Sequence, residues 1–410
     1  MPCTRGDGKL HITYNEMGQG DNILITCPNG NVVVIDCGTA RWDGNFFNPP
    51  GIPAQLRERA VHTVFDNCFL GTNQTINVLI LTHADKDHCN ELKSIFNHTL
   101  ADGTPRINQI DALYHSGKIN DYEEGSAAHY LTNELVPIHT YAITINDKSQ
   151  TINDNPIPDS AANTAEINKT SLVAATRHFV KVLDGTAPHG HKECGVYILA
   201  SNVGAYAAGV KDNSSDDNRG SIVTLIIYGD KKFLFMGDGT YHTEKFLLDK
   251  YGATISNVEL LHAGHHASYN TSSSYLGDTN KPQPIKNINF IGRVNPQYLA
   301  VSAAYDSGQS LKLPRWETIN NYINGALRLV RRNNFEINCW WFVPAVYAPS
   351  TGKNKKKRKT VTPDHNEVGS RKTHRMISCT GTHGVLDYDY KEQNDGHGNI
   401  SIVRFRRSDP

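Results

Sequence analysis

The sequence lacks an excess of charge of either sign, because its 41 lysines and arginines balance 41 aspartates and glutamates among 410 residues. It also lacks any apolar run near the roughly 20 residues of a membrane-spanning helix, and its first residues show no unbroken apolar segment of the signal-peptide kind. Apolar residues make up 38% of the chain, which excludes a collagen-like or wholly disordered protein. The sequence therefore predicts a soluble globular protein of the cytoplasm, with no membrane partner.

The eight cysteines lie far apart, and no two of them form a C-x-x-C pair. This spacing gives no sign of a zinc ribbon or of a disulfide framework. We therefore expect reduced thiols, which agrees with a cytoplasmic location.

Runs of aliphatic and β-branched residues alternate with turn residues along much of the chain. Strands are predicted at 11–14, 23–25, 32–35, 76–81, 196–199, 222–228, 233–236, 258–261 and 298–301. Asn29-Gly30 separates two of these runs and predicts a hairpin turn. Apolar residues at helical spacing predict helices near 92–96, 243–251 and 316–330.

Two segments interrupt this pattern. Residues 143–170 are rich in Asn, Asp, Ser, Thr and Pro and have little periodicity, which indicates a long loop or an insertion. Six lysines and arginines crowd positions 353–359, where they predict either contact with a phosphate backbone or a solvated loop. We divide the chain into a domain over 1–330, with an insertion at about 103–195, and a C-terminal extension over 331–410 that offers a surface for a protein partner.

Side chains able to bind a metal ion follow three of the predicted strands. They are His83, Asp85, Asp87 and His88 after the strand at 76–81, Asp238 after the strand at 233–236, and His265 with His266 after the strand at 258–261. Imidazole and carboxylate groups are ligands of zinc, manganese and iron. A single Asp or His at a strand end is more often a turn former or a cap, but the pattern H-x-D-x-D-H is far more specific. The three strand ends therefore predict one metal cluster.

These segments resemble the metallo-β-lactamase superfamily. The matching segments are Met17-Gly18-Gln19-Gly20-Asp21, Ile35-Asp36-Cys37-Gly38, Thr82-His83-Ala84-Asp85-Lys86-Asp87-His88, Gly237-Asp238-Gly239 and Gly264-His265-His266-Ala267-Ser268. The aspartate at position 85 is typical of the soluble β-lactamase-like domain of ComEC-type DNA-uptake competence proteins. The resemblance spans about residues 10–315. It implies an α+β fold, an αββα sandwich with the metal site along one edge between the two sheets.

The resemblance also implies roles for individual residues. His83 and Asp85 would hold a first metal ion, and Asp238 would bridge it to a second. Asp87, His88 and one histidine of the later pair, His265 in preference to His266, would hold the second ion. Asp87, His266 and Asp36 form the catalytic set, in which His266 touches the substrate or protonates a leaving group and Asp36 orients the site by hydrogen bonds. Arg219 and Ser221 lie where the competence-type proteins carry an Asn-Ser element, so they are either phosphate contacts or a simple loop and cap.

The sequence departs from the family pattern at two places. The usual histidine between the first motif and the Gly-Asp has no clear counterpart, because none of the candidates has a convincing context; these are His115, His178, His189 and His191. The resemblance therefore leaves one ligand of the first metal ion unassigned, so this ion would be held weakly or its shell would be completed by water. Residues 311–314 stand where the competence-type proteins commonly carry Gly-His-Pro, so we expect no substrate-side histidine there.

The ligand types indicate hydrolysis. One or two divalent ions, zinc or manganese with magnesium also compatible, lower the pKa of a bound water from near 15.7 toward about 7. Anionic ligands that face an anionic substrate require the metal charge, which favours a phosphodiesterase or nuclease that meets nucleic acid at the site and through the 353–359 segment. Two alternatives stay open. One is a hydrolase of a small molecule, such as a cyclic nucleotide, lactone or ester, and the other is a non-catalytic subunit of a multi-protein defence or toxin system.

Overall fold

The structure is a computed structural model of the chain. It describes residues 5–39, 61–65, 68, 75–99, 103–123, 126–154, 179–188, 191–211, 214–276, 283–286, 288–303, 313–343, 346–347, 360–362, 365–380, 386–393 and 399–407. None of the helices in these ranges is long and apolar enough to cross a membrane.

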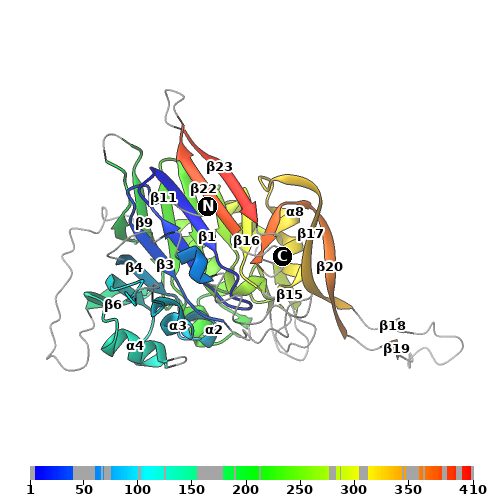
Figure 1. Ribbon diagram of the computed structural model, residues 1–410. Coiled ribbons are helices and arrows are strands. Elements are labelled where there is room, and N and C mark those ends of the chain that lie inside the picture. Colours follow the sequence, from blue (N-terminus) through cyan, green and yellow to red (C-terminus); the bar gives the residue numbers. More distant parts are fainter. Residues whose placement is uncertain are drawn as a thin grey trace, which may run out of the picture.

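Two large mixed sheets lie face to face at the centre of the described part of the chain (Figure 1). The first sheet consists, in spatial order, of β23 (Ile400–Arg407), β22 (Leu386–Glu392), β1 (Lys9–Tyr14), β2 (Ile23–Thr26), β3 (Val32–Ile35), β4 (Thr75–Leu81), β5 (Gln109–His115), β6 (His139–Ile145) and β7 (Gln150–Asp154). The second consists of β21 (Ile377–Cys379), β16 (Tyr298–Val301), β13 (Leu260–His262), β12 (Lys231–Phe235), β11 (Val223–Tyr228), β9 (Cys194–Ala200) and β8 (Val180–Asp184).

Smaller pairings and helices complete the described structure. The pairings are β10 (Val210–Lys211) with β14 (Ser273–Leu276) and β15 (Gln283–Lys286), β17 (Arg331–Val343) with β20 (His365–Arg375), and β18 (Val346–Tyr347) with β19 (Thr360–Thr362). The helices are α2 (Lys86–Cys89), α3 (Leu92–Phe96), α4 (Ala127–Asn133), α5 (Asp216–Gly220), α6 (Tyr241–Tyr251), α7 (Ile288–Val294) and α8 (Trp316–Gly325), with 3-10 turns η1 (Ile119–Asp121) and η4 (Gly264–Ala267).

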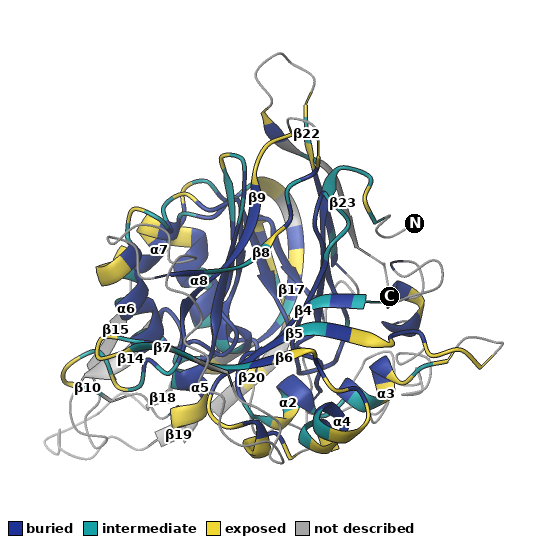
Figure 2. Ribbon diagram, turned by 90° about the vertical axis from the view of Figure 1, so that its left-hand side faces the viewer, coloured by how far each residue is buried: buried dark blue, intermediate teal, exposed yellow. Residues whose placement is uncertain are grey.

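The alternation of side chains along the strands creates three apolar cores. In β3, Val33 and Ile35 point between the two sheets, whereas Val32 and Val34 point outward, as the two-residue repeat of a strand requires. The outward residues of the first sheet pack against α3 and α4, and those of the second sheet pack against α6, α7 and α8. Figure 2 shows buried residues throughout both sheets and on the helix faces turned toward them. The layers therefore run helix, sheet, sheet, helix, which confirms the predicted α+β sandwich.

Parallel strands place the predicted metal-binding loops at carboxyl ends of strands. Strands β3, β4, β5 and β6 are parallel neighbours in the first sheet, and β12, β13, β16 and β21 are parallel neighbours in the second. Asp36 follows β3, the 82–88 loop follows β4, Asp238 follows β12, and η4 follows β13. Loops far apart in the sequence can therefore meet at one edge of the sandwich.

Two predicted elements differ from the structure. The helix predicted at 316–330 ends at Gly325, because Ala326 has an extended backbone and the chain then leads into β17. Residues 143–170 were predicted to form a long loop or an insertion, and the loop alternative is wrong for 143–154, which belong to the β6–β7 hairpin. The side-chain oxygen of Asn146 accepts hydrogen bonds from the amides of Lys148 and Ser149 and so closes that turn. The rest of the predicted loop lies outside the described residues.

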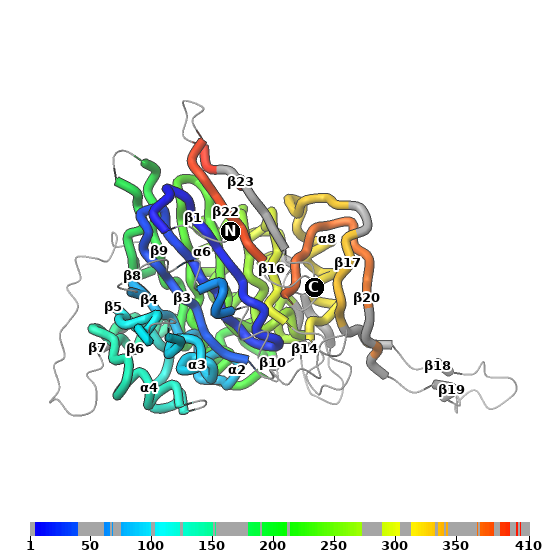
Figure 3. Tube along the Cα trace, in the orientation of Figure 1, coloured from blue at the N-terminus to red at the C-terminus, as the bar shows by residue number. Residues whose placement is uncertain are grey.

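The predicted insertion and C-terminal extension both contribute strands to the sandwich. Strands β5 to β7 continue the first sheet and β8 forms one edge of the second. At the opposite end of the first sheet, β22 pairs with β1 and β23 forms the edge, and in the second sheet β21 pairs with β16 at the edge. Figure 3 shows the C-terminal β22 beside the N-terminal β1, with the β17–β20 ribbon next to α8. The basic segment 353–359 lies outside the described residues.

Candidate metal centre

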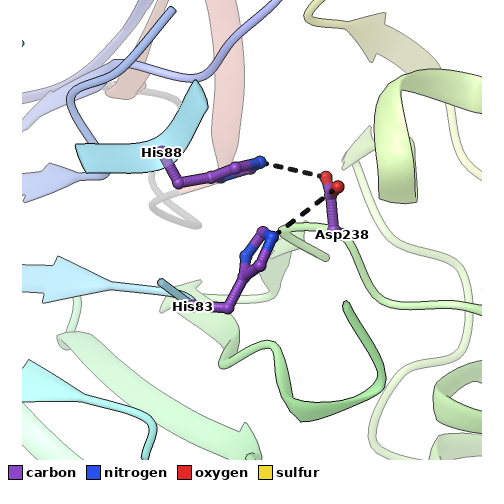
Figure 4. A group of neighbouring side chains, drawn as sticks. All are labelled: His83, His88 and Asp238. Atoms are coloured by element: carbon purple, nitrogen blue, oxygen red, sulfur yellow. Dashed lines mark ion pairs between the residues drawn. The ribbon is translucent and has the colours of Figure 1, made fainter. Parts of the chain in front are cut away.

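The loops after β4, β12 and β13 bring imidazole and carboxylate groups to one buried point. Asp238 lies at its centre. Its Oδ1 is 3.3 Å from Nε2 of His88 and 3.4 Å from Nε2 of His266. Its Oδ2 is 3.8 Å from Nε2 of His83 and 3.5 Å from Nε2 of His265. Figure 4 shows His83 and His88 pointing at this carboxylate. The two carboxylate oxygens therefore face two different groups of nitrogen atoms.

Four of these converging atoms are buried and have no hydrogen-bond partner. They are Nε2 of His83, His88 and His266, and Oδ1 of Asp238. A buried polar atom without a partner costs about 1–3 kcal/mol, so four such atoms at one point need a common explanation. Bound cations would satisfy these atoms. Two overlapping sets have ligand atoms within 4.8 Å of one another: His83, His88 and Asp238 in one, and Asp87, His88 and His266 in the other.

The second ring nitrogen of each histidine is held by the protein. Nδ1 of His266 donates to the carbonyl of Ser302 at 2.6 Å. Nδ1 of His83 lies 3.1 Å from Oγ1 of Thr82. The Thr82 hydroxyl donates its only proton to a carboxylate, so it can only accept from His83. Because these Nδ1 atoms act as donors, each ring in its neutral form would present an unprotonated Nε2 to Asp238, which is the tautomer that binds a metal.

Asp36 supports the 82–88 loop from the interior. Its buried carboxylate accepts hydrogen bonds from the Thr82 amide at 2.7 Å, the Thr82 hydroxyl at 2.6 Å and Nδ1 of His88 at 2.7 Å. Asp36 has a left-handed backbone conformation, with φ of 56°, and its carbonyl accepts from the Asn22 side chain at 2.9 Å. These bonds set both the backbone position of the loop and the orientation of the His88 ring.

The turn after β13 has a strained backbone. His265, His266 and Ala267 are left-handed in succession, with φ of 45°, 50° and 57°. This conformation costs an L-residue roughly 1–2 kcal/mol. The His265 amide donates to the Gly237 carbonyl at 3.0 Å, and the Arg315 amide donates to the Ala267 carbonyl at 3.0 Å. These bonds hold the turn in place. Within it, the side chains of the two adjacent histidines point in different directions.

His265 and His266 occupy different environments. Both ring nitrogens of His265 have partners, since Nδ1 lies 3.0 Å from the Ser268 hydroxyl and Nε2 accepts from Asn218 at 3.0 Å. Its side chain is 18% exposed, whereas that of His266 is 1% exposed. Nε2 of His266 has no hydrogen-bond partner and lies 3.3 Å from Oδ2 of Asp87. Nε2 of His266 therefore lies among the buried converging atoms, whereas His265, the ligand predicted from the sequence, lies at the rim with both ring nitrogens hydrogen-bonded.

The carboxylates make the cluster strongly cation-attracting. Burial lowers the pKa of His266, but Asp238, Asp87 and Asp21 outweigh this effect and raise the pKa to about 10. Burial also opposes ionisation of Asp238, yet the neighbouring imidazoles, first that of His266, hold its pKa well below the usual range. Protons balance the carboxylates when no cation is bound. A divalent ion would displace these protons, as metal binding to imidazoles does in general.

The remaining predicted residues divide between the cluster and the surface. Asp85 lies at the mouth, with a 40% exposed side chain whose Oδ2 is 3.4 Å from Nε2 of His83. The Ser221 hydroxyl lies 3.2 Å from Nδ1 of His83 and accepts from the Asp238 amide at 3.1 Å. The Arg219 guanidinium instead donates to Ser214 and Asp216 on its own surface segment. The structure thus brings Ser221 to the site and gives Arg219 local partners.

No candidate for the missing middle histidine joins the cluster among the described residues. The His115 ring packs edge-on against Tyr122, which belongs to the helix-side core of the first sheet. His191 lies on the surface, 3.3 Å from Glu392. His178 and His189 lie outside the described ranges. Sequence reasoning also missed Asn218 and Ser302, which contact the two adjacent histidines. Neither residue has a motif of its own that would mark it.

Comparisons with known proteins concern the fold. No protein-family model and no curated protein sequence matches the chain. Among solved structures, it is similar to the metallo-β-lactamase fold protein YhfI from Bacillus subtilis, with 10% identity, a TM-score of 0.33, and coverage of 70% of this chain and 85% of that one. It is also similar to the short form of human tRNase Z (12% identity, TM-score 0.33, 70% of this chain and 91% of that one). A third match is CmlA, a diiron β-hydroxylase from Streptomyces venezuelae (12% identity, TM-score 0.34, 73% and 45%). At these TM-scores the likenesses assign neither a family nor a substrate to the chain.

Proposed function

We propose that the protein is a metal-dependent hydrolase of phosphodiesters and that its substrate is a nucleic acid. One observation carries this proposal: three imidazole Nε2 atoms and one carboxylate oxygen converge in the interior without hydrogen-bond partners. Their Nδ1 atoms are held by groups that orient each ring. This arrangement is characteristic of metal sites, where one ring nitrogen of a histidine binds the ion and the other is normally hydrogen-bonded to the protein.

The two oxygens of Asp238 suggest how two ions would be shared. His83 faces Oδ2, and Asp85 lies beside it, so these residues would hold one ion. His88 and His266 face Oδ1 and would hold a second ion with Asp87. Asp238 would then bridge the two positions. When bound, the ions supply Lewis acidity and a water molecule of lowered pKa.

Residues at the mouth of the cluster would orient the substrate. Asp85 is exposed and anionic, so a phosphodiester can approach only where cations offset this charge. His265 and Asn218 lie together at the rim and offer neutral polar groups to a phosphate oxygen or a leaving group. The basic segment 353–359 adds positive charge elsewhere in the chain, which suits a polyanionic substrate.

The test is metal analysis of the purified protein, followed by incubation with single- and double-stranded DNA and RNA in manganese, zinc or magnesium. We expect cleavage that Asp87→Ala and Asp238→Ala abolish. Asp184→Ala serves as the matched control, because this carboxylate lies on the surface with Lys181 as its neighbour. Cleavage that survives both site substitutions would contradict the proposal.

Two other outcomes would redirect the assignment. A protein that holds metal, ignores nucleic acid and opens a cyclic nucleotide, lactone or ester would be a small-molecule hydrolase. A protein that holds no metal and hydrolyses nothing would be a non-catalytic subunit. Neutralising the six charges of 353–359 and measuring how nucleic-acid affinity varies with salt tests the basic segment separately, since each lost phosphate contact reduces the salt dependence.

A further inference from the structure

A buried carboxylate at the base of the cluster has no assigned role. Asp21 lies in the turn between β1 and β2, and its side chain is 1% exposed. Its Oδ1 is among the buried atoms without a hydrogen-bond partner, as are Oδ1 of Asp238 and Nε2 of His266. The ligand atoms of Asp21, Asp238 and His266 lie within 4.8 Å of one another. Two buried carboxylates therefore share one small volume, which requires positive charge.

The backbone holds Asp21 at this point through a close crossing of two loops. The Asp21 amide donates to the Asp87 carbonyl at 3.0 Å, and the Asp21 carbonyl accepts from the Gly38 amide at 3.0 Å. A Cβ atom on Gly20 would overlap the Gly38 carbonyl and lie 2.8 Å from the Asp87 carbonyl. Glycine at this position thus permits the crossing. The segment Gly18-Gln19-Gly20-Asp21 therefore delivers a carboxylate to the metal-binding loop.

Within the part of the chain that the structure describes, the Asp21 side chain forms ion pairs with two imidazoles. Nε2 of His262 lies 3.4 Å from Oδ1, and Nδ1 of His88 lies 3.8 Å from Oδ2. Nδ1 of His88 is already bound to Asp36 at 2.7 Å, and Nε2 of His262 also lies 3.1 Å from the Ser302 hydroxyl. These contacts are longer than a strong charge-assisted hydrogen bond, so Asp21 keeps an oxygen available for a cation.

We propose that Asp21, together with Asp238 and His266, is a further ligand of the second ion, the one faced by His88, His266 and Asp87, whose place we call the inner position. This inference rests on the proposed function, because it concerns the same site. With Asp87 and His88 added, the inner position has three carboxylates and two imidazoles. Oxygen-rich sets suit manganese and magnesium better than zinc, which prefers nitrogen and sulfur ligands. Asp21 thus biases the inner position toward manganese.

The experiment compares metal affinities of the full chain and its variants. Apo protein is titrated with Mn²⁺, followed by the electron paramagnetic resonance signal of the free ion, and with Zn²⁺ in competition with a chromogenic chelator. We expect Asp21→Asn to weaken Mn²⁺ binding on the order of 100-fold, the upper end of what loss of a supporting group costs, and to weaken Zn²⁺ binding several-fold less. Asp389→Asn is the matched control, since this buried carboxylate pairs with a histidine at the far edge of the first sheet.

A second variant separates ligation from simple charge balance. If Asp21 only compensates His262, then His262→Gln will reproduce the loss of Mn²⁺ affinity, and that result overturns the proposal. Equal Mn²⁺ affinity of Asp21→Asn and wild type overturns it as well, while leaving the proposed function intact. A wild-type chain that binds neither metal overturns both.

A crystal structure of the wild-type protein soaked in Mn²⁺ gives an answer that does not depend on whether a variant folds. Anomalous scattering locates the ion directly. A manganese–oxygen distance to Asp21 of about 2.0–2.3 Å, the range of carboxylate ligation, supports the proposal. An ion beyond contact distance of this carboxylate refutes it.

Discussion

Asp36→Asn tests whether the site depends on support from behind its ligands. The carboxylate of Asp36 accepts three hydrogen bonds, two from Thr82 and one from His88. Asparagine has nearly the same shape and tolerates the left-handed backbone of this position, where φ is 56°. The substitution therefore removes the charge and one acceptor and leaves the backbone unstrained.

The expected magnitude follows from the lost bond to His88. Hydrogen bonds that involve a charged group contribute about 1.5–3 kcal/mol, so the free energy of unfolding should fall by about that amount. Loss of a partner that orients a metal ligand typically costs 10–100-fold in metal affinity. Urea denaturation measures the first quantity, and competition with a chelator measures the second.

Asp389→Asn separates the two effects. This residue accepts a bond of 2.8 Å from Nδ1 of His11, at an edge of the first sheet. We expect it to lose a similar amount of stability while metal affinity stays at the wild-type value. The reasoning is refuted if Asp36→Asn binds metal as tightly as wild type, or if Asp389→Asn loses metal affinity to the same extent.

Further substitutions and the pH dependence test other parts of the structure. His266→Ala should reduce metal affinity at least tenfold more than His265→Ala in the same titration, and equal losses would contradict the ligand choice. Ser221→Ala removes the acceptor for the Asp238 amide, so the free energy of unfolding should fall by about 1 kcal/mol and metal affinity should fall with it. Wild-type stability and metal affinity in this variant would count against the contact. Burial lowers the pKa of His11, but its aspartate neighbours, Asp389 first, raise it to about 9. Because the pKa is raised on folding, this contribution is fully present below about pH 6.5 and disappears as the pH rises through about 9, with an upper limit of about 3 kcal/mol. Unfolding curves between pH 6 and 10 should show a smaller slope in Asp389→Asn, in which Asp7 still pairs with His11.

Local patterns predicted the strands near the site and the loops that follow them. The outward and inward alternation of Val32 to Ile35 was readable because each side chain is set by its neighbours in the chain. The hairpin at Asn29-Gly30 was also local, and Gly30 adopts the positive φ that the turn needs, at 92°. The β6–β7 hairpin was missed because its polar composition masked two strands that pair at an edge.

The sequence contains no local pattern that predicts which distant segments come into contact. His11 and Asp389 form an ion pair across 378 positions of sequence, in the pairing that places β22 beside β1. Nothing within either segment identifies the other. Asp21 was visible as part of a glycine-rich turn, but its approach to Asp238 depends on a crossing of two backbones.

The amino-acid sequence by itself determined which residue types follow each strand, and therefore that imidazoles and carboxylates gather at strand ends. Only the tertiary structure decided which atoms meet. Adjacent residues such as His265 and His266 have the same chemistry, and a left-handed turn held by bonds to Gly237 and Arg315 separates their directions. The physical reason is that ligand identity depends on orientation in space, and that orientation is set by contacts from parts of the chain that are remote in sequence.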